Sequence, residues 1–495
     1  MKLVKVEKYV SWPNGLGAIA VLSVLIFQVI WIPSYAATWD MVDFALGVLH
    51  FDIYQMRPHF PGYPYFILGG TAIHVLVDDP VRALTLFNIL LYASSMIPLF
   101  LLVRKVVRPS YALMAMAIIY TSSYTVLMVH QPMSEGAAIA VMWWYVWSLM
   151  LANRKSHNGF LILPLFLFSL LLGIRLSYLA LGTGILVVFF YKLKKGSLKP
   201  SETPLYLLIA VLFQLLWVTG ISLSEGGYQS FMRLAFSFTS GHFQEWGGAI
   251  GASELSLWDR VLKLIFINTA WTGWFHQSVP LLFLVIVSIL LLRHTRFGNS
   301  EMKGLLLVLM GSYFIWALFA QNVVKPRHAL PLIGIAIFFA AAKMFSRKHS
   351  RIGLILLCCI LMVQVTLTGK SLYSHSSDRP AVYQMADYLE KQEQPLIVYT
   401  WEESRVLQYL SVPYLHKKVQ TYEVFATDIG YYPDRDIYVT DKVVEGFKSQ
   451  GKSIESFIKV QKKFHSSKLI DPVYYDLTLY KWENPKIQQR EGENG

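Results

Sequence analysis

Stretches of about 20 mostly apolar residues recur along the chain from about residue 16 to about residue 370. A helix of about 20 apolar residues is long enough to cross the hydrocarbon core of a bilayer. Apolar residues make up 55% of the 495 residues and charged residues only 15%, whereas charged residues average about 25% in soluble domains. The sequence therefore predicts a polytopic α-helical membrane protein.

We predict about eleven transmembrane helices from the positions and lengths of these runs. No small-residue cleavage site follows the first run, so we expect a retained helix and not a cleaved signal peptide. The stretch 63–78 is apolar but short, with two glycines and a histidine, and we expect it to lie at the membrane interface. The predicted spans cover approximately residues 16–36, 83–103, 110–128, 135–152, 159–173, 177–191, 203–223, 278–293, 303–320, 329–345 and 351–370.

Lysine and arginine residues cluster in short loops at one set of predicted helix ends, as in RKVVR at 104–108. Cytoplasmic loops of membrane proteins carry such an excess of basic residues. Topology therefore explains the net charge of +13, and we expect no nucleic acid partner. We predict a multi-pass protein of the plasma (cytoplasmic) membrane, with its N-terminus inside and its C-terminus outside. The outer loops are then 37–82, 129–135, 224–277 and 321–328; within the third, 258–276 has the pattern of an interfacial amphipathic helix.

The composition changes near residue 371, where long apolar runs end and charged residues become frequent. Short β-like runs, PLIVYTW, KKVQTYEV, DIYVTD and YYDLTLYKW, alternate with helical patterns such as AVYQMADYLEKQ and EESRVLQYL. Such alternation is typical of an α/β domain. We therefore divide the chain into a transmembrane domain, 1–370, and an extracytoplasmic α/β domain, 371–495, whose tail at 486–495 is expected to be disordered.

The first outer loop holds the densest group of ionisable residues, within TWDMVDFALGVLHFDIYQMRPHFPGYP at 38–64. This stretch contains three aspartates, two histidines, an arginine and a PGYP turn. Its prolines restrict the backbone, and Gly62 permits a tight turn into the following helix. A loop of this composition, held against a bilayer, is where we expect the chemistry of the protein.

The chain resembles the GT-C superfamily of polytopic membrane glycosyltransferases, in particular the protein O-mannosyltransferase and aminoarabinose-transferase branch. The resemblance rests on Trp39-Asp40 just after the first span, on the turn HFPGYP at 59–64, and on the order of loops and domains. Many members carry two adjacent acidic residues in the first loop, whereas two residues separate Asp40 from Asp43 here. The WWDYG sequence of the oligosaccharide-transferring members is absent.

The resemblance implies an inverting enzyme of the cell envelope. It would move a sugar from a polyprenyl-phosphate donor to an acceptor hydroxyl of a protein, a lipid or a glycan. A carboxylate must deprotonate that hydroxyl, and we predict Asp40 for this role. If the segment is helical, the i,i+3 spacing places Asp43 on the same face, as a second carboxylate or an acceptor clamp. The alternative is that both are ordinary interfacial polar residues or helix caps.

Cations must stabilise the charge that gathers on the leaving phosphate. Arg175 lies between two short apolar runs, where an arginine is costly unless it faces a cavity or a partner, and relatives carry a lysine or arginine near the donor phosphate at this place. Arg327 and His328 open a span in VVKPRHALP, as the RYxLP-like segment of relatives does, and Arg327 has the fork geometry to hold a phosphate. Arg57 and His59 are further candidates for phosphate or sugar binding. The alternative roles are headgroup contacts and structural hydrogen bonds.

Glu135, in HQPMSEG, begins the fourth predicted span on the outer side. Relatives carry an acidic residue in this second outer loop, which helps to position the acceptor or the base, so we include Glu135 among the catalytic candidates. The alternative is an acid that stabilises a helix N-terminus, with Ser134 nearby as the cap.

Two other functions stay open. A transporter or flippase of a lipid-linked glycan would place charged residues in mid-span and show internal repeats, whereas the long predicted spans have few charges at their centres and no evident repeat. A non-catalytic membrane protein whose outer domain binds a partner would tolerate a change at Asp40. No set of His, Cys and Asp has metal-ligand spacing, so we predict no metal ligands and leave a divalent-metal requirement open. The sequence has no Walker loop that would suit a cytosolic nucleotide sugar.

Overall fold

A computed structural model describes residues 9–245, 247–291, 297–346 and 351–483. Within these ranges the chain packs into two compact units. The first contains Met1–Pro33 and Phe44–Tyr373, and the second contains Ser34–Asp43 and Ser374–Gly495, in each case as far as the described ranges extend. The predicted boundary at 371 lies close to this division, but the short segment Ser34–Asp43 joins the second unit. The predicted disordered tail at 486–495 lies outside the described residues.

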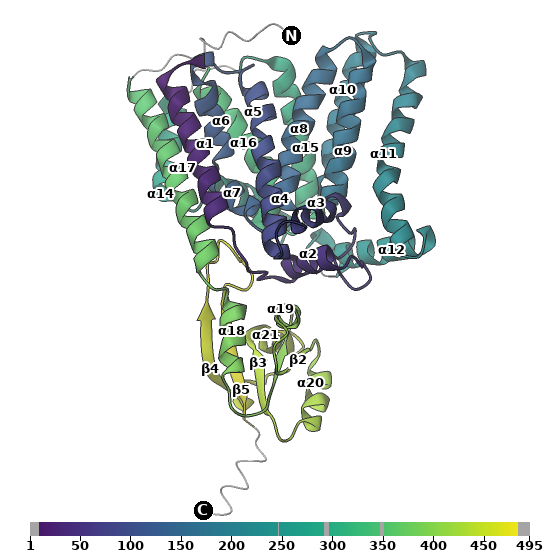
Figure 1. Cartoon of the computed structure of the whole chain (residues 1–495), viewed down its shortest axis with the longest axis vertical. Helices are drawn as coiled ribbons and strands as arrows, with labels where there is room; N and C mark the ends of the chain where they lie inside the picture. Colours follow the sequence, from purple (N-terminus) through teal and green to yellow (C-terminus); the bar gives the residue numbers. More distant parts are fainter. Residues whose placement is uncertain (1–8, 246, 292–296, 347–350, 484–495) are drawn as a thin grey trace, which may run out of the picture. The chain divides into compact units, whose positions relative to one another are not determined.

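The first unit is built of helices, most of which run side by side along one direction (Figure 1). A helix satisfies its own backbone N–H and C=O groups, which is what a lipid environment demands. α2 (Trp39–Leu49) begins among the residues of the second unit and continues into the first. The other α-helices of the first unit are α1 (Trp12–Ile30), α3 (Pro64–His74), α4 (Pro80–Ser94), α5 (Met96–Val103), α6 (Ala112–Tyr120), α7 (Ser123–Val129), α8 (Glu135–Arg154), α9 (Ile162–Ile174), α10 (Thr183–Lys194), α11 (Thr203–Ser224), α12 (Tyr228–Gln244), α13 (Leu257–Leu262), α14 (Val279–Leu291), α15 (Ser300–Ala320), α16 (Leu330–Met344) and α17 (Arg351–Ser377).

Eight helices in the described part of the chain are long and apolar enough to cross a membrane, and two bent pairs raise the number to ten if each pair is one span. The bent pairs are Pro109–Tyr120 with Ser123–Val129, at 59°, and Leu257–Trp274 with Val279–Leu291, at 104°. The predicted span at 159–173 corresponds to Asn158–Ile174, a shorter apolar helix. Every predicted span thus falls on a helix or on a bent pair, and the chain is a multi-pass membrane protein.

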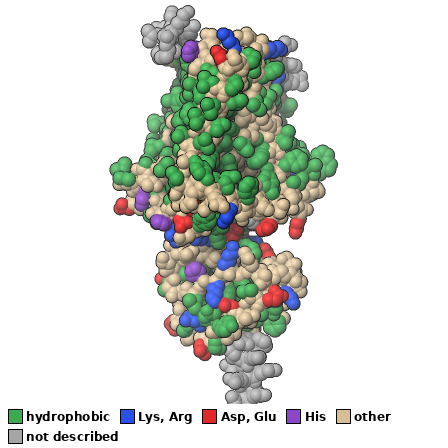
Figure 2. All heavy atoms as spheres, turned by 90° about the vertical axis from the view of Figure 1, so that its right-hand side faces the viewer, with side chains coloured by type: hydrophobic (Ala, Val, Ile, Leu, Met, Phe, Trp, Pro, Cys, Tyr) green, Lys and Arg blue, Asp and Glu red, His purple; other side chains and the backbone are tan. Residues whose placement is uncertain are grey.

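The surface of α11 shows why this unit requires an apolar surrounding. Four of its leucines, spaced three or four residues apart, are each more than half exposed: Leu205, Leu208, Leu212 and Leu216. Such spacing places them on one face of the helix. Figure 2 shows hydrophobic side chains over the middle of the face that α11 borders, with charged side chains toward its ends. A stripe of this kind is unfavourable in water and stable against lipid tails.

Some of the segments predicted to lie outside the spans are also helical. α3 has only 11 residues and lies across the ends of the upright helices (Figure 1), so the stretch 63–78 is not a span. The amphipathic stretch 258–276 forms α13 and the π-helix η7 (Lys263–Trp274). α12 was predicted as loop because glycine, serine and aromatic residues dominate its sequence. Its 17 residues form a helix that also lies across the bundle end.

The second unit contains a five-stranded sheet with strand order β2-β1-β3-β5-β4. β1 pairs in parallel with β2 and β3, and β5 pairs antiparallel with β3 and β4. β1 is apolar and buried along its whole length, as is typical of a parallel strand covered on both faces. The strands are β1 (Leu396–Thr400), β2 (Leu415–Lys418), β3 (Asp436–Thr440), β4 (Ile458–His465) and β5 (Asp476–Trp482), and the helices are α18 (Ala381–Glu390), α19 (Glu403–Leu410), α20 (Tyr422–Asp428) and α21 (Asp441–Ser449).

Two elements of this unit differ from the predicted ones. The run KKVQTYEV was predicted as one strand, but β2 ends at Lys418 and α20 begins at Tyr422. The hydroxyl of Thr421 accepts the N–H of Val424 at 3.5 Å and caps the helix, which ends the extended backbone. β4 was not predicted because most of its IKVQKKFH side chains are exposed, and lysines are common on such edge strands.

Glu403 is a buried carboxyl at the start of α19, just after β1. Its Oε2 accepts the backbone N–H of Trp401 at 2.9 Å, and burial raises the pKa of the Glu403 carboxyl from 4.5 to about 7. Between pH 4.5 and about pH 7 the Glu403 carboxyl therefore stays protonated in the folded protein but loses its proton in the unfolded chain. The contribution of Glu403 to the free energy of unfolding is therefore greatest below pH 4.5 and falls by about 3 kcal/mol as the pH rises through 7.

Replacing Glu403 with glutamine keeps a hydrogen-bond acceptor but removes this titration. We expect the melting temperature of Glu403→Gln, relative to that of the wild type, to rise between pH 5 and pH 8. Thermal unfolding of both full-length proteins in detergent at the two pH values measures this difference. The other carboxyls contribute equally to the pH dependence of both proteins, so their effect cancels in the comparison. A difference in melting temperature that is equal at both pH values would contradict the prediction.

Candidate functional site

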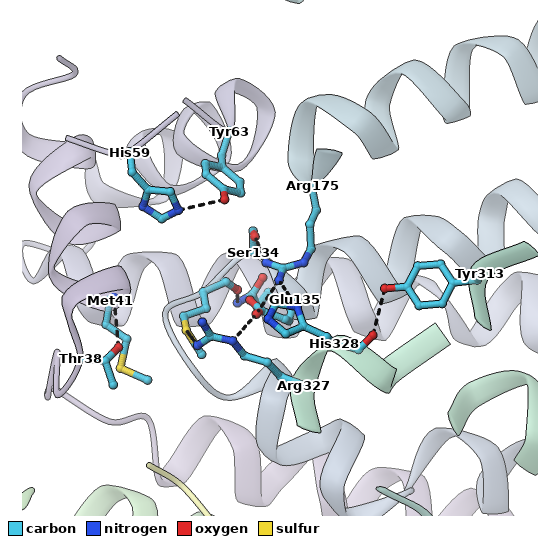
Figure 3. Close-up of polar contacts among 12 residues, drawn as sticks. Thr38, Met41, His59, Tyr63, Ser134, Glu135, Arg175, Tyr313, Arg327 and His328 are labelled. Atoms are coloured by element: carbon cyan, nitrogen blue, oxygen red, sulfur yellow. Dashed lines mark hydrogen bonds and ion pairs between the residues drawn. The ribbon is translucent and has the colours of Figure 1, made fainter. Parts of the chain in front are cut away.

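Three charged side chains that are distant in the sequence form one buried cluster in the first unit (Figure 3). Oε1 of Glu135 lies 3.0 Å from Nη2 of Arg175 and 3.1 Å from Nε of Arg327. Glu135 is 1% exposed and Arg175 is 8% exposed, and the Arg327 side chain is 14% exposed. The structure thus brings together three residues that the sequence analysis proposed separately.

Each of these residues stands at the beginning of a helical segment. Glu135 is the first residue of α8, Arg175 directly precedes η4 (Leu176–Gly182), and Arg327 lies in η8 (Pro326–Ala329), which leads into α16. The N-terminus of a helix carries unpaired N–H groups and a partial positive charge. Two guanidinium groups and one carboxylate have a net charge of about +1, and the helix ends add to it. This is the electrostatic arrangement of an anion-binding site.

Neutral groups complete the cluster around Arg175. Its Nη1 donates to the hydroxyl of Ser134 at 3.0 Å, and its Nη2 lies 3.3 Å from Nδ1 of His328. A guanidinium can only donate, so Nδ1 is the acceptor and neutral His328 carries its proton on Nε2. The Tyr313 hydroxyl donates to the carbonyl of His328 at 3.0 Å. His328 therefore belongs to the same cluster. Ser134, the expected cap of α8, makes no capping hydrogen bond with its side chain and contacts Arg175 instead.

A buried asparagine of α4 holds the turn that precedes Glu135. Nδ2 of Asn88 donates to the carbonyls of Gln131 and Met133, at 2.8 Å in each case. Gly136 allows the start of α8 to approach α7 closely, since a Cβ atom there would lie 2.8 Å from a backbone carbon of α7. The backbone position of Glu135 is thus set by groups from α4, α7 and α8.

Arg260 of α13 holds the segment that leads to Arg327. Its side chain is fully buried and donates to the carbonyls of Leu318, Gly248 and Gln321, at 2.9, 3.1 and 2.8 Å. The planar guanidinium presents its donors in fixed directions, so one side chain can join separate stretches of backbone. Arg260 therefore fixes the end of α15 and the loop before η8.

We expect Arg260→Leu to lower the free energy of unfolding by about 3 kcal/mol or more, because each buried carbonyl left without a donor costs about 1–3 kcal/mol. The measurement is thermal unfolding of the purified protein in detergent. Arg233 of α12 is exposed, and Arg233→Leu is the matched control, with an expected change within about 0.5 kcal/mol. Equal melting temperatures for the two variants would refute the role of Arg260.

The proline-rich turn of the first loop contributes Tyr63 to the surroundings of the cluster. Tyr63 has a left-handed backbone conformation, with φ 47° and ψ 48°, which is uncommon for a residue with a side chain. Its hydroxyl hydrogen-bonds Nε2 of His59 at 2.9 Å (Figure 3). His59 and Tyr63 thus form a pair of polar side chains within the turn. The backbone of Arg57 pairs with Asp52 in a short bridge, and Arg57 does not join the ion pairs around Glu135.

Asp40 and Asp43 of the first loop lie in the second unit, at the start of α2. The segment is helical, as the i,i+3 argument required, and the Thr38 hydroxyl accepts the N–H of Met41 at 3.4 Å. Asp43 is fully buried, and its Oδ1 lies 2.9 Å from Nε of Arg405. Its carboxylate is therefore engaged in an ion pair, which favours a structural role over that of an acceptor clamp. Asp40 is half-buried in the first turn of α2, and its role as base stays a prediction.

Four of the residues that build the site were not predicted from the sequence: Tyr63, Asn88, Arg260 and Tyr313. For Asn88 the sequence contained a signal, since a lone asparagine in an apolar span requires a polar partner. Among the residues that the structure describes, no group of three or more His, Cys, Asp or Glu side chains lies in a position to hold a metal ion.

No protein-family model and no curated protein matches this sequence. Solved structures are similar in fold. The aminoarabinose transferase ArnT from Cupriavidus metallidurans, bound to undecaprenyl phosphate, has a TM-score of 0.57 and 11% identity over 94% of this chain and 98% of that chain. Its apo state has a TM-score of 0.55 and 10% identity, over 95% and 98%. An oligosaccharyltransferase from Archaeoglobus fulgidus, tethered with an acceptor peptide, has a TM-score of 0.48 and 12% identity, over 88% and 69%. The chain therefore shares the polytopic membrane fold of the ArnT structures.

Proposed function

We propose that this protein is an inverting glycosyltransferase that moves a sugar from a polyprenyl-phosphate donor to an acceptor hydroxyl at the outer face of the plasma membrane. The observation that carries the proposal is the buried pair of guanidinium groups, Arg175 and Arg327, on the single carboxylate of Glu135. The cluster occurs in a fold shared with ArnT, whose structure contains undecaprenyl phosphate. The chemistry of the cluster and the similarity in fold support the same class of donor.

The cluster matches what the leaving group needs. The acceptor oxygen forms a bond to the anomeric carbon, the bond from that carbon to the phosphate oxygen breaks, and the lipid phosphate leaves with the electron pair. Arg175 and Arg327 offset the charge that develops on the phosphate, and buried guanidinium groups do this more effectively than solvated ones. His328 supplies a further donor or acceptor beside Arg175.

Asp40 takes the proton of the acceptor hydroxyl as the new bond forms. The hydroxyl attacks the face opposite the leaving phosphate, so the anomeric configuration inverts. Glu135 acts in this scheme as the counter-ion that holds the two guanidinium groups in place, because two cations that share one carboxylate would repel each other without it. The acceptor is a protein, a lipid or a glycan, and the sugar is a hexose or a pentose.

A flippase of a lipid-linked glycan is the second candidate function. The positions of the charged residues favour the transferase. Glu135, Arg175 and Arg327 stand at the ends of helical segments, whereas a transport path requires charged or polar groups along the middle of the spans.

Full-length protein in liposomes, supplied with undecaprenyl phosphate that carries radiolabelled hexoses or pentoses, distinguishes the two functions. A transferase releases undecaprenyl phosphate and passes the label to an acceptor or to water. A flippase moves the labelled lipid between leaflets with its glycosidic bond intact. Translocation without release of undecaprenyl phosphate from any of the sugars would overturn the proposed function.

A further inference from the structure

Residues 34–43 follow the first membrane span in the sequence, yet they pack with the C-terminal residues of the second unit. The N–H of Ala36 donates to the hydroxyl of Tyr383 at 3.0 Å, and these residues are 347 positions apart. The rings of Tyr35 and Tyr383 lie 5.1 Å apart. Nζ of Lys418 lies 4.6 Å from the centre of the Trp39 ring. The α/β unit therefore holds this piece of the first outer loop as part of its own structure.

The strongest of these contacts is made by Arg405. Its Nε lies 2.9 Å from Oδ1 of Asp43, its Nη1 donates to Gln408 at 3.1 Å, and its guanidinium carbon lies 5.6 Å from the centre of the Trp39 ring. Arg405 is 8% exposed and Asp43 is fully buried. Removing one partner of a buried ion pair leaves an uncompensated charge, so such pairs strongly favour one arrangement of the chain. Trp39 and Asp43 flank Asp40 in the first turns of α2.

The held segment lies at a particular edge of the sheet. Lys418 is the last residue of β2, and Arg405 is the third residue of α19, the helix that follows β1. Both therefore stand at the carboxyl ends of parallel strands, which is the edge where α/β folds bind their ligands. Here this edge carries a segment of the same chain, and that segment contains Asp40.

We propose that Arg405 is a positioning residue for glycosyl transfer: through Asp43 and Trp39 it fixes the first turn of α2 and so the direction of the Asp40 carboxylate. The inference rests on the proposed role of Asp40 as base. Asp43 is then an anchor and not a second catalytic carboxylate. A displacement of about 1 Å at a catalytic group costs about 100-fold in rate, so the loss of this anchor should appear in kcat.

The first test uses full-length protein in liposomes with the undecaprenyl-phosphate sugar that gives turnover. Arg405→Met is expected to lower kcat at least tenfold and to leave the KM for the donor within twofold. Arg405→Lys keeps the charge and should recover part of the lost rate. Lys448→Met is the control, because Lys448 forms an exposed ion pair with Glu455 at 3.3 Å in the same unit, and its kcat should equal that of the wild type.

A second measurement separates positioning from stability. The double variant Asp43→Leu/Arg405→Met has no buried unpaired charge, so it should melt closer to the wild type than either single variant does. Its kcat should nevertheless stay at least tenfold low. Hydrogen exchange followed by mass spectrometry should be faster in the peptide 34–43 of Arg405→Met and unchanged in the β3 peptide 436–440. A double variant with wild-type kcat would show that Arg405 is merely structural.

Asp40→Asn decides whether Arg405 acts through Asp40. If Asp40→Asn has a strongly lowered kcat and adding Arg405→Met to it lowers the residual turnover no further, the inference stands. If Asp40→Asn is inactive and Arg405→Met keeps the wild-type kcat, the inference fails while the proposed function survives. If Asp40→Asn turns over normally, Asp40 is not the base, and the positioning role falls with it.

Discussion

Replacing Asp40 with asparagine is expected to slow sugar transfer about 100-fold or more and to leave the binding of the lipid phosphate intact. Asparagine has nearly the same shape as aspartate and still accepts hydrogen bonds, but its amide cannot take a proton from the acceptor hydroxyl. General-base catalysis contributes about 10²- to 10⁴-fold to rate, so kcat should fall by a factor in that range. In the proposed mechanism the phosphate is held by Arg175 and Arg327, whereas Asp40 acts on the acceptor hydroxyl.

The experiment compares turnover and donor binding for Asp40→Asn and for a matched control in the same predicted loop. Asp78 is exposed, and Asp78→Asn should leave both quantities unchanged. Turnover follows the release of undecaprenyl phosphate, and binding is measured by the rise in melting temperature on addition of undecaprenyl phosphate. Wild-type turnover in Asp40→Asn would remove Asp40 from the mechanism. Loss of donor binding in the same variant would assign Asp40 to the phosphate site.

The second large effect concerns the charge balance of the cluster. Arg175→Met or Arg327→Met leaves one guanidinium paired with Glu135, so the net charge falls from about +1 to zero and the buried pair remains satisfied. Truncating one partner of a buried charged contact costs about 2–5 kcal/mol in binding, so the affinity for undecaprenyl phosphate should fall about 30-fold or more. The free protein should lose little stability.

Glu135→Gln should have the opposite pattern. It leaves two buried guanidinium groups without their shared carboxylate, and breaking a buried ion pair in this way destabilises a protein by about 3–5 kcal/mol. An anionic ligand then supplies the missing charge. We therefore expect the free protein to melt well below the wild type, and undecaprenyl phosphate to raise its melting temperature by more than it raises that of the wild type.

Thermal unfolding of the four proteins, with and without undecaprenyl phosphate, tests both patterns. Neutral dodecyl maltoside without the lipid gives the baseline, and inorganic phosphate shows how much of the effect is due to the anion alone. Arginine variants that bind the lipid as tightly as the wild type would exclude the cluster as the phosphate site. A Glu135→Gln protein as stable as the wild type would show that the carboxylate is not needed to balance the two cations.

The transmembrane helices and the α/β unit could be predicted because each depends on local patterns. An apolar run of about 20 residues has one stable state in a bilayer, and a buried strand such as Leu396–Thr400 is recognisable from its apolar residues. Where the local pattern is weak, the prediction failed. The helix Tyr422–Asp428 was predicted in part as strand and the strand Ile458–His465 was not predicted, because a helix cap and an exposed edge strand leave little hydrophobic pattern.

The candidate site was only partly predictable. Arg175 was chosen because an arginine between apolar runs is costly without a partner, and Glu135, Arg327 and His328 were chosen from the resemblance to the GT-C superfamily. Nothing in the sequence indicated that they would be one another's partners, because the ion pairs join residues 40 or more positions apart and depend on how the helices pack. The sequence grouped Asp43 with Asp40 as a catalytic candidate, whereas its partner is Arg405.

The sequence by itself determined that this is a multi-pass membrane protein with an α/β unit and a charged first loop, because hydrophobic length and charge act locally. Only the tertiary structure decided which charges neutralise which. It placed two arginines on one glutamate in the helical unit, and it assigned residues 34–43 to the C-terminal unit and not to the bundle. The physical reason is that a buried charge requires a partner, and the chain meets that requirement by packing that no local pattern encodes.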